Sequence, residues 1–213
     1  MRQVTAIACV LVLMATAGNA GAVGWHLGIK GGVNMADLAG DDGPSDTSFR
    51  NGFIGGGFAD YLLNDRFGVR AEVLYVQKGA EGSFVVPGQD HAHDSIVKLD
   101  YVEIPLLFTG RFPAGEKFAF GLFAGPTLSF NTTAEVEIPS HNETEALDAV
   151  KSFELGAAFG GGIEYILPSF SLLADARYGL GTASVIEDIA GQTVDVKNRG
   201  LGIMAGVAVP IGR

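Results

Sequence analysis

The sequence predicts an all-β fold, an eight-stranded antiparallel up-and-down transmembrane β-barrel. Three observations lead to this prediction. Apolar and polar residues alternate with a period of two along eight segments, which places each set on one face of a strand. Long and short connections alternate between the segments, and aromatic residues stand in pairs near the ends of the apolar faces. A barrel whose outer face contacts lipid has all three properties.

The alternation is clear in segment 67–79, where Phe67 and Tyr75 share one face and Arg70 and Glu72 share the other. Further segments follow the same rule, and no segment after the first two dozen residues shows a convincing helical period. The eight predicted strands lie near residues 24–35, 51–63, 67–79, 96–110, 117–131, 152–166, 170–183 and 199–211.

The connections between these segments sort by length. The long connections are 36–50, 80–95, 132–151 and 184–198, and the short ones are 64–66, 112–116 and 167–169. A membrane barrel has tight turns on one side and long loops on the other, whereas a soluble sandwich has no reason to sort its loops in this way. The pattern therefore favours a membrane barrel with both chain termini on the side of the short turns.

Aromatic residues bracket the apolar faces. Same-face pairs such as Phe67 and Tyr75 are 8 to 12 residues apart, which corresponds to roughly 20–30 Å along the membrane normal for tilted strands. This distance matches the apolar band between the two aromatic girdles of transmembrane barrels. The predicted membrane-interface aromatics are Trp25, Phe53, Tyr61, Phe67, Tyr75, Phe118, Phe130, Phe153, Tyr165, Phe170 and Tyr178.

The opposite face of the predicted strands carries charges of both signs. In a barrel of eight strands this face lines a narrow lumen that side chains can just fill. Buried charges must be paired, so the sequence predicts a lumenal charge network. Its expected members are Lys30, Arg70, Glu72, Glu103, Glu164, Asp175 and Arg177. Glycine runs at 55–57 and 160–162 would relieve crowding in the lumen or permit strong strand curvature.

The first 22 residues have the three-part pattern of a secretory signal peptide. Arg2 supplies the positive charge, residues 7–15 form the apolar stretch, and residues 20–22 read Ala-Gly-Ala before the cleavage point. We therefore expect a cleaved signal at 1–22 and one barrel domain at 23–213. The single cysteine, Cys9, would leave with the signal, so we expect no disulfide and no cysteine metal site in the mature chain.

The composition excludes two classes of protein. Charged residues make up only 18% of the 213 residues, which excludes an intrinsically disordered chain. The formal net charge is −10, which argues against a nucleic-acid partner because binding to phosphate needs a basic surface.

Several stretches of the chain carry a recognisable pattern. Residues 99–108 read Leu-Asp-Tyr-Val-Glu-Ile-Pro-Leu-Leu-Phe, residues 28–34 are rich in glycine, and residues 70–79 read Arg-Ala-Glu-Val-Leu-Tyr-Val-Gln-Lys-Gly. Together with 121–126 and 176–181, these stretches resemble the bacterial outer-membrane β-barrel domain family, often labelled porin-like. The resemblance covers essentially the whole mature chain. It implies a small eight-stranded outer-membrane barrel of the OmpA and OmpX type.

The C-terminus departs from the family pattern. Such barrels commonly end on an aromatic residue that the barrel-assembly machinery reads, whereas this chain ends Val209-Pro210-Ile211-Gly212-Arg213. Proline cannot donate to a strand ladder, so we expect Pro210 near a strand end or on an unpaired edge.

The expected function is a structural, adhesive or envelope-interaction role in the outer membrane, with a narrow pore as a further option. Eight strands leave no aqueous channel of porin width. The expected partners are outer-membrane lipid, lipopolysaccharide and the barrel-assembly machinery, and we expect a monomer with no cofactor. Fifteen of the 24 acidic residues lie in the long connections. They would form a rim that binds divalent cations or meets lipopolysaccharide through them, or simply a solvated surface.

Two alternatives remain open at the level of sequence. A soluble periplasmic barrel that binds an apolar ligand would turn its apolar faces inward. An outer-membrane barrel enzyme would place its catalytic side chains at the loop rim, where His91 and His93 are the candidates. Their spacing lacks the rest of a metal coordination set, and it resembles no active site of such enzymes, so no catalytic or metal site is expected.

Overall fold

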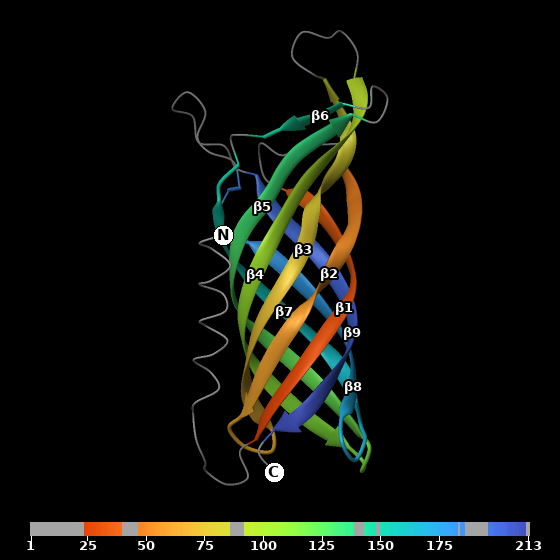
Figure 1. Ribbon diagram of the computed structural model, residues 1–213, viewed down its shortest axis with the longest axis vertical. Coiled ribbons are helices and arrows are strands. Elements are labelled where there is room, and N and C mark those ends of the chain that lie inside the picture. The colour runs from red at the N-terminus through yellow and green to blue at the C-terminus, as the bar shows by residue number, and fades with distance from the viewer. Residues whose placement is uncertain are drawn as a thin grey trace.

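The structure is a computed structural model that describes residues 24–39, 47–85, 92–138, 143–147, 150–182, 184–185 and 196–211 (Figure 1). Its strands are β1 (Trp25–Ala39), β2 (Thr47–Leu62), β3 (Phe67–Val85), β4 (Ala92–Ala114), β5 (Phe118–Ile138), β6 (Glu143–Ala146), β7 (Phe153–Ile166), β8 (Ser171–Gly181) and β9 (Lys197–Ile211). None of the described residues forms a helix long and apolar enough to cross a membrane. The predicted signal peptide at 1–22 lies outside the described residues.

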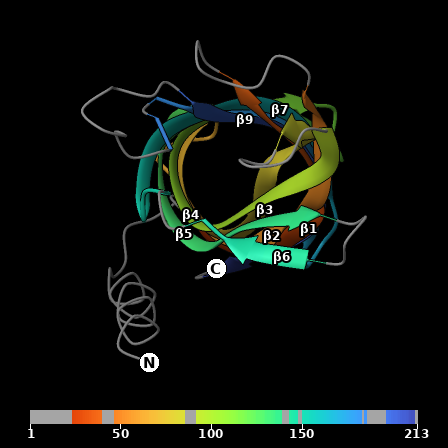
Figure 2. The ribbon, with the colours of Figure 1, turned by 90° about the horizontal axis from the view of Figure 1, so that it is seen from above.

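The eight long strands close into a barrel because β1 is paired on both of its edges (Figure 2). Trp25 lies opposite Tyr61 of β2 and opposite Ile211 of β9. The ring runs β1-β2-β3-β4-β5-β7-β8-β9 and returns to β1, with antiparallel neighbours throughout. Closure pairs the strand edges without any disulfide. The predicted eight-stranded antiparallel barrel is thus confirmed.

Three short turns lie at one end of the barrel, which we call the short-turn end. They cover residues 63–66, 115–117 and 167–170. The first turn is held by the side chain of Asn64, whose Oδ1 accepts hydrogen bonds from the backbone N–H groups of Arg66 and Phe67 at 2.9 Å each. The start of β1 and the end of β9 lie at the same end, because Trp25 is opposite Ile211. The longer connections lie at the opposite end, which we call the far end.

Six strands extend further than predicted toward the far end. β1 ends at Ala39 rather than 35, β2 begins at Thr47 rather than 51, and β9 begins at Lys197 rather than 199. β3 reaches Val85 rather than 79, β4 begins at Ala92 rather than 96, and β5 ends at Ile138 rather than 131. The predicted connections 36–50, 80–95 and 132–151 are therefore too long. The reason is that residues such as those at 80–83 have no apolar alternation. Hydrogen bonding between strands can continue beyond the membrane, where neither face of a strand contacts lipid and no alternation is required.

A ninth strand, β6, was not predicted. It lies within the predicted connection 132–151 and pairs antiparallel with the end of β5, with Glu143 opposite Ile138. It stands at the far end in Figure 1 and takes no part in barrel closure. At the other end of the barrel, Pro210 lies opposite His26, one residue before the end of β9, which agrees with the expected position near a strand end.

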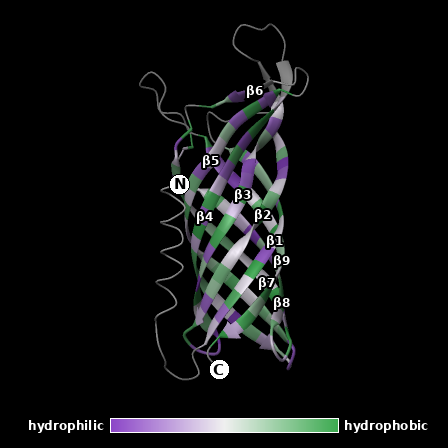
Figure 3. Ribbon diagram, viewed as in Figure 1, coloured by the Kyte–Doolittle hydropathy of each residue, from purple (hydrophilic) through white to green (hydrophobic). Residues whose placement is uncertain are grey.

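The two faces of the wall differ sharply in polarity. Ile29 is 67% exposed on the outside, whereas the adjacent Lys30 is 5% exposed and points into the lumen. Apolar and polar residues alternate in this way along the strands in Figure 3. This arrangement is the opposite of the one that the soluble ligand-binding alternative requires, because the apolar faces point outward and the charges point inward.

Candidate functional site

A central cluster of ion pairs fills the middle of the lumen. Lys30 Nζ of β1 lies 2.7 Å from Glu72 Oε1 of β3 and 3.1 Å from Asp175 Oδ2 of β8. Arg177 Nη2, also on β8, lies 2.7 Å from Glu72 Oε2. The Glu72 side chain is completely buried. Because β1, β3 and β8 contribute these groups, the cluster joins strands from different parts of the wall.

Arg70 extends the central cluster toward the short-turn end. Its guanidinium forms two hydrogen bonds with Asp60 of β2, with Nε to Oδ1 at 2.7 Å and Nη2 to Oδ2 at 2.8 Å. Its Nη1 lies 3.8 Å from Glu72 Oε1. The Phe58 ring covers the guanidinium at 4.7 Å. The central cluster therefore comprises Lys30, Asp60, Arg70, Glu72, Asp175 and Arg177, with equal numbers of positive and negative groups.

A second group of polar residues, the upper cluster, lies closer to the far end. Lys78 Nζ is 2.6 Å from Glu103 Oε1, and the Ser129 hydroxyl donates a hydrogen bond to the same oxygen at 3.1 Å. Asn198 Nδ2 donates to Glu154 Oε2 at 2.9 Å. These five residues form the upper cluster.

The seven predicted network residues thus fall into three groups rather than one. Lys30, Arg70, Glu72, Asp175 and Arg177 belong to the central cluster. Glu103 belongs to the upper cluster, and Glu164 pairs with Arg111 at the short-turn end, with 2.7 Å between Oε2 and Nε.

Several lumenal charges were absent from the predicted network. Lys78, Arg111 and Glu154 are members of these ion-pair groups. Their positions on the inward parity of the strands would have identified them. Asp37, which pairs with Arg199 at 2.6 Å, falls within the predicted connection 36–50, where no parity could be assigned.

Apolar side chains close the lumen at the far end. We call this group the apolar cap; it consists of Leu38, Ala80, Leu99, Tyr101, Val185 and Val196, each at most 7% exposed. Two residues of the cap come from the chain between β8 and β9 and are tied together, since the Val185 N–H donates to the Val196 carbonyl at 2.8 Å. The Lys151 N–H donates to the Val185 carbonyl at 2.8 Å.

Two small cavities lie along the lumen. A vestibule of about 90 Å³ at the short-turn end is lined by His26, Arg111, Glu164 and Asp175 among others. A chamber of about 30 Å³ is lined by Lys78, Glu103, Glu154 and Arg177 among others. Asp175 faces the vestibule and Arg177 faces the chamber, so the central cluster separates the two. The described part of the lumen is therefore divided by buried charged groups.

The predicted membrane-interface aromatics lie on the outer wall in two groups. Near the short-turn end, Trp25 contacts Tyr61 with ring centroids 4.8 Å apart, and Phe118 contacts Tyr165 at 5.0 Å. Phe67 and Phe170 lie near the same end. The remaining five predicted aromatics, placed further along the strands, are Phe53, Tyr75, Phe130, Phe153 and Tyr178.

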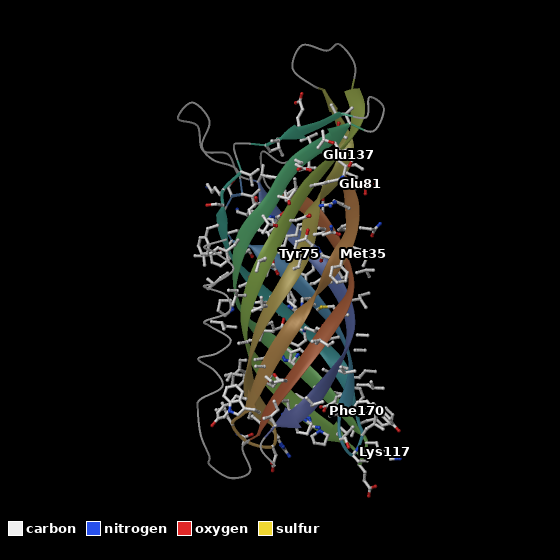
Figure 4. All side chains as sticks on the ribbon, viewed as in Figure 1. Met35, Tyr75, Glu81, Lys117, Glu137 and Phe170 are labelled. Carbon is white, nitrogen blue, oxygen red and sulfur yellow. The ribbon has the colours of Figure 1, made fainter. Side chains whose placement is uncertain are left out.

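The axial order of these groups can be followed in Figure 4. Phe170 lies near the short-turn end, Tyr75 lies much further along the wall, and Glu81 and Glu137 lie beyond Tyr75 toward the far end. The surface between the aromatic groups is apolar, with residues exposed by 38% or more that include Leu27, Ile29, Val33, Val69, Leu106, Leu122, Leu155, Ile163, Leu172, Ile203, Val207 and Val209.

The candidate rim site cannot be assembled from the described residues. His91 lies outside them, and for His93 the structure describes the backbone in β4 but not the side chain. Within the described part of the chain, no group of three or more His, Cys, Asp or Glu residues could hold a metal ion.

Comparison with solved structures finds bacterial surface and outer membrane proteins. A major outer membrane protein of Thermus thermophilus is 14% identical, covers 89% of this chain and 100% of its own, and gives a TM-score of 0.56. OprG of Pseudomonas aeruginosa is also 14% identical, over 88% of this chain and 96% of its own, with a TM-score of 0.51. Neisserial surface protein A is 20% identical, over 87% of this chain and 96% of its own, with a TM-score of 0.49. At these identities the likeness concerns the fold.

Comparison at the level of sequence gives the family. Curated protein sequences yield no significant match. The model of the family described as outer membrane protein beta-barrel domain matches residues 18–186. That match spans most of the chain, and it agrees with a closed barrel that is apolar outside and charged inside. The chain therefore belongs to the outer membrane protein β-barrel domain family.

Proposed function

We propose that this chain is a monomeric, non-enzymatic outer-membrane barrel that presents an acidic rim to lipopolysaccharide through bridging divalent cations. The observation that carries the proposal is that the lumen is blocked twice. Ion pairs divide it in the middle, and the apolar cap closes it at the far end. Because this lumen offers a solute no open path along the described residues, the outer wall and the rim are the surfaces left for interaction.

The outer wall supports a position across the membrane. An apolar surface bounded by aromatic residues at both ends matches the hydrocarbon core and its two interfaces. In barrels of this architecture the short turns lie in the periplasm and the longer connections lie outside the cell. The far end would then face the cell surface. Insertion would depend on the barrel-assembly machinery, since a partly formed sheet would expose unpaired backbone groups to lipid until the barrel closes.

Several acidic side chains lie on the parts of β3, β5 and β6 at the far end of the barrel. Glu81 of β3, Glu135 of β5 and Glu145 of β6 have no ion-pair partner among the described residues. Glu137 of β5 pairs with Lys98 of β4. Carboxylate oxygens are the ligands that Ca²⁺ and Mg²⁺ prefer. Such cations would bridge the rim to the anionic groups of lipopolysaccharide, which would otherwise repel it.

Binding of labelled lipopolysaccharide to the barrel in phosphatidylcholine nanodiscs tests the proposed function. The triple variant E81Q/E135Q/E145Q should weaken the Mg²⁺-dependent binding, because it removes three carboxylates of the rim. The double variant D65N/E116Q is the matched control, because it removes carboxylates exposed in turns at the short-turn end. Equal Mg²⁺-dependent binding by the wild type and the triple variant would contradict the proposal.

A further inference from the structure

A groove on the outer wall lies near the short-turn end, where β1, β2, β3 and β4 run side by side (Figure 1). Its volume is about 270 Å³, larger than that of either lumenal cavity. Ala59 of β2 and Ala71 of β3 lie directly opposite each other and both line the groove. Their short side chains form the floor of a notch that bulky aromatic residues border.

Aromatic residues border the notch on both sides. On the β1 side, the rings of Trp25 and Tyr61 pack together at 4.8 Å. On the β4 side, Phe108 lines the groove and stacks on Phe67 at 5.7 Å. Paired rings have little freedom to move, so the sides of the groove are preformed. A long apolar group in the groove would contact the two alanines beneath it and an aromatic pair on each side.

An acyl chain is the occupant that this position favours. The groove is continuous with the apolar outer wall, which the proposed function places in lipid. A protein segment is a poor alternative there, because its backbone N–H and C=O groups would lack partners in the hydrocarbon region. An acyl chain has no such groups and gains contact with the aromatic rings.

The turn at 63–66 connects β2 and β3, the two strands that carry Ala59 and Ala71, and contains a cation. Arg66 is exposed and directly precedes Phe67. The turn is fixed by Asn64, which accepts from the Arg66 N–H at 2.9 Å, and by the Arg111 N–H, which donates to the Arg66 carbonyl at 2.6 Å. A guanidinium at the level of the lipid headgroups suits a phosphate. Asp65 is its exposed acidic neighbour.

We propose that this groove binds one anionic glycerophospholipid of the periplasmic leaflet, with an acyl chain over Ala59 and Ala71 and the phosphate at Arg66. The proposal rests on the membrane position that the proposed function assigns to the wall. It goes beyond that function, because it assigns a specific lipid site to the end of the barrel away from the acidic rim.

The single tryptophan of the chain makes the site directly measurable. Trp25 lines the groove, and a brominated acyl chain in contact with its ring would quench its fluorescence. The barrel is reconstituted in phosphatidylcholine vesicles with increasing fractions of brominated phosphatidylglycerol or, separately, brominated phosphatidylcholine. We expect quenching by brominated phosphatidylglycerol to exceed its mole fraction, with a roughly fivefold preference from one cation near an anionic headgroup.

Two variants separate the acyl chain from the headgroup. A59L/A71L fills the notch with apolar side chains on the lipid-facing wall and should abolish the excess quenching. Its control is A157L, which enlarges an outward-facing alanine on β7 away from the groove. R66Q should remove only the preference for phosphatidylglycerol, whereas K117Q, a cation in the turn at 115–117, should keep it. D65N should strengthen the preference.

The outcomes distinguish this proposal from the proposed function. Quenching that follows the mole fraction of either brominated lipid, and is unchanged in A59L/A71L, would mean ordinary boundary lipid and overturn the site. Absence of quenching by any brominated lipid would contradict the membrane position itself. Loss of lipopolysaccharide binding at the rim, tested separately, leaves the groove unaffected.

Discussion

At the scale of single residues, Glu72 is the most heavily paired carboxylate of the lumen. It lies within ion-pair distance of Lys30, Arg70 and Arg177. Two of these contacts are at 2.7 Å, and the side chain is fully buried. Removing this charge leaves cations without compensation in a place that water does not reach, which is the costly way to alter a buried ion pair.

We therefore expect E72Q to lower the free energy of unfolding by about 3–5 kcal/mol. Urea titration of the barrel in lipid vesicles, followed by gel mobility of unboiled samples, measures this change. The variant K30M/E72M removes one charge of each sign and should recover most of the loss, because an apolar pair can replace a buried ion pair at small cost. If E72Q unfolds at the same urea concentration as the control E116Q, Glu72 does not hold the central cluster together.

A double-mutant cycle tests the separation between the two clusters. Lys78 and Glu103 are in contact, whereas Arg70 belongs to the central cluster. The cycle for K78M and E103Q should give a coupling energy of about 1 kcal/mol or more, and the cycle for R70M and E103Q should give less than about 0.5 kcal/mol. Comparable coupling in both cycles would mean that the lumenal charges form one network.

The membership of the lumenal face was predictable from the sequence, but the pairing was not. Parity alone places Glu72 and Glu103 inward, since each alternates with outward apolar residues. Which cation each one meets depends on how far the strands are shifted against one another and on how far the side chains reach. Glu103 lies opposite Leu74 of β3, yet its partner is Lys78, four residues further along that strand. The sequence pattern carries no information on that shift.

At the scale of strands, close packing between neighbours requires glycine at particular positions. A Cβ atom on Gly56 of β2 would lie 2.0 Å from the Val73 carbonyl oxygen of β3, whereas one on the adjacent Gly57 would meet nothing closer than 3.7 Å. The predicted relief of crowding by glycines 55–57 therefore applies to Gly56 and not to Gly57. The backbone of β3 cannot retreat from Gly56 without disturbing Leu74, which is completely buried.

We expect G56A to destabilise the barrel by about 1–3 kcal/mol, the usual cost of inserting an extra methyl group into packed structure. The neighbouring substitution G57A should change the stability by less than about 0.5 kcal/mol, because its methyl group would make only an ordinary van der Waals contact, 3.7 Å from the Gly28 carbonyl oxygen. Both variants can be measured in the same urea titration. Equal effects of the two substitutions would show that β2 and β3 are not as close as described.

Strand ends were the least predictable feature at this scale. The alternation that marks a strand holds while one face meets lipid and the other meets the lumen. Past Gly79 in β3 the ladder continues without it through residues 80–83, whereas the end of β5 keeps an alternation of its own at 134–138, beyond the predicted strand. β6, only four residues long, carries no alternation that a reader of the sequence could use.

At the scale of the whole molecule, the closed lumen predicts the absence of steady conductance. Wild-type barrels in planar bilayers should show no stable open level, because the central cluster and the apolar cap both interrupt the path. A regular, reproducible conductance step from the wild type would contradict the closed lumen and favour the narrow pore. The variant K30A/E72A/R177A/V185D removes both obstructions and should conduct more than the wild type. Conductance by this variant shows that the barrels insert into the bilayer under the conditions of the experiment.

The orientation of the wall is the central claim, and cysteine scanning of β9 tests it most directly. Single cysteines replace Leu201, Ile203 and Val207, which face outward, and Met204 and Ala208, which face the lumen, in a C9S background. Fluorescent labels at the first three positions should be quenched by brominated lipid, whereas the two lumenal cysteines should escape both labelling and quenching. A series in which lumenal and outward positions respond alike, or in which water-soluble quenchers reach the outward positions, would contradict a membrane-spanning barrel.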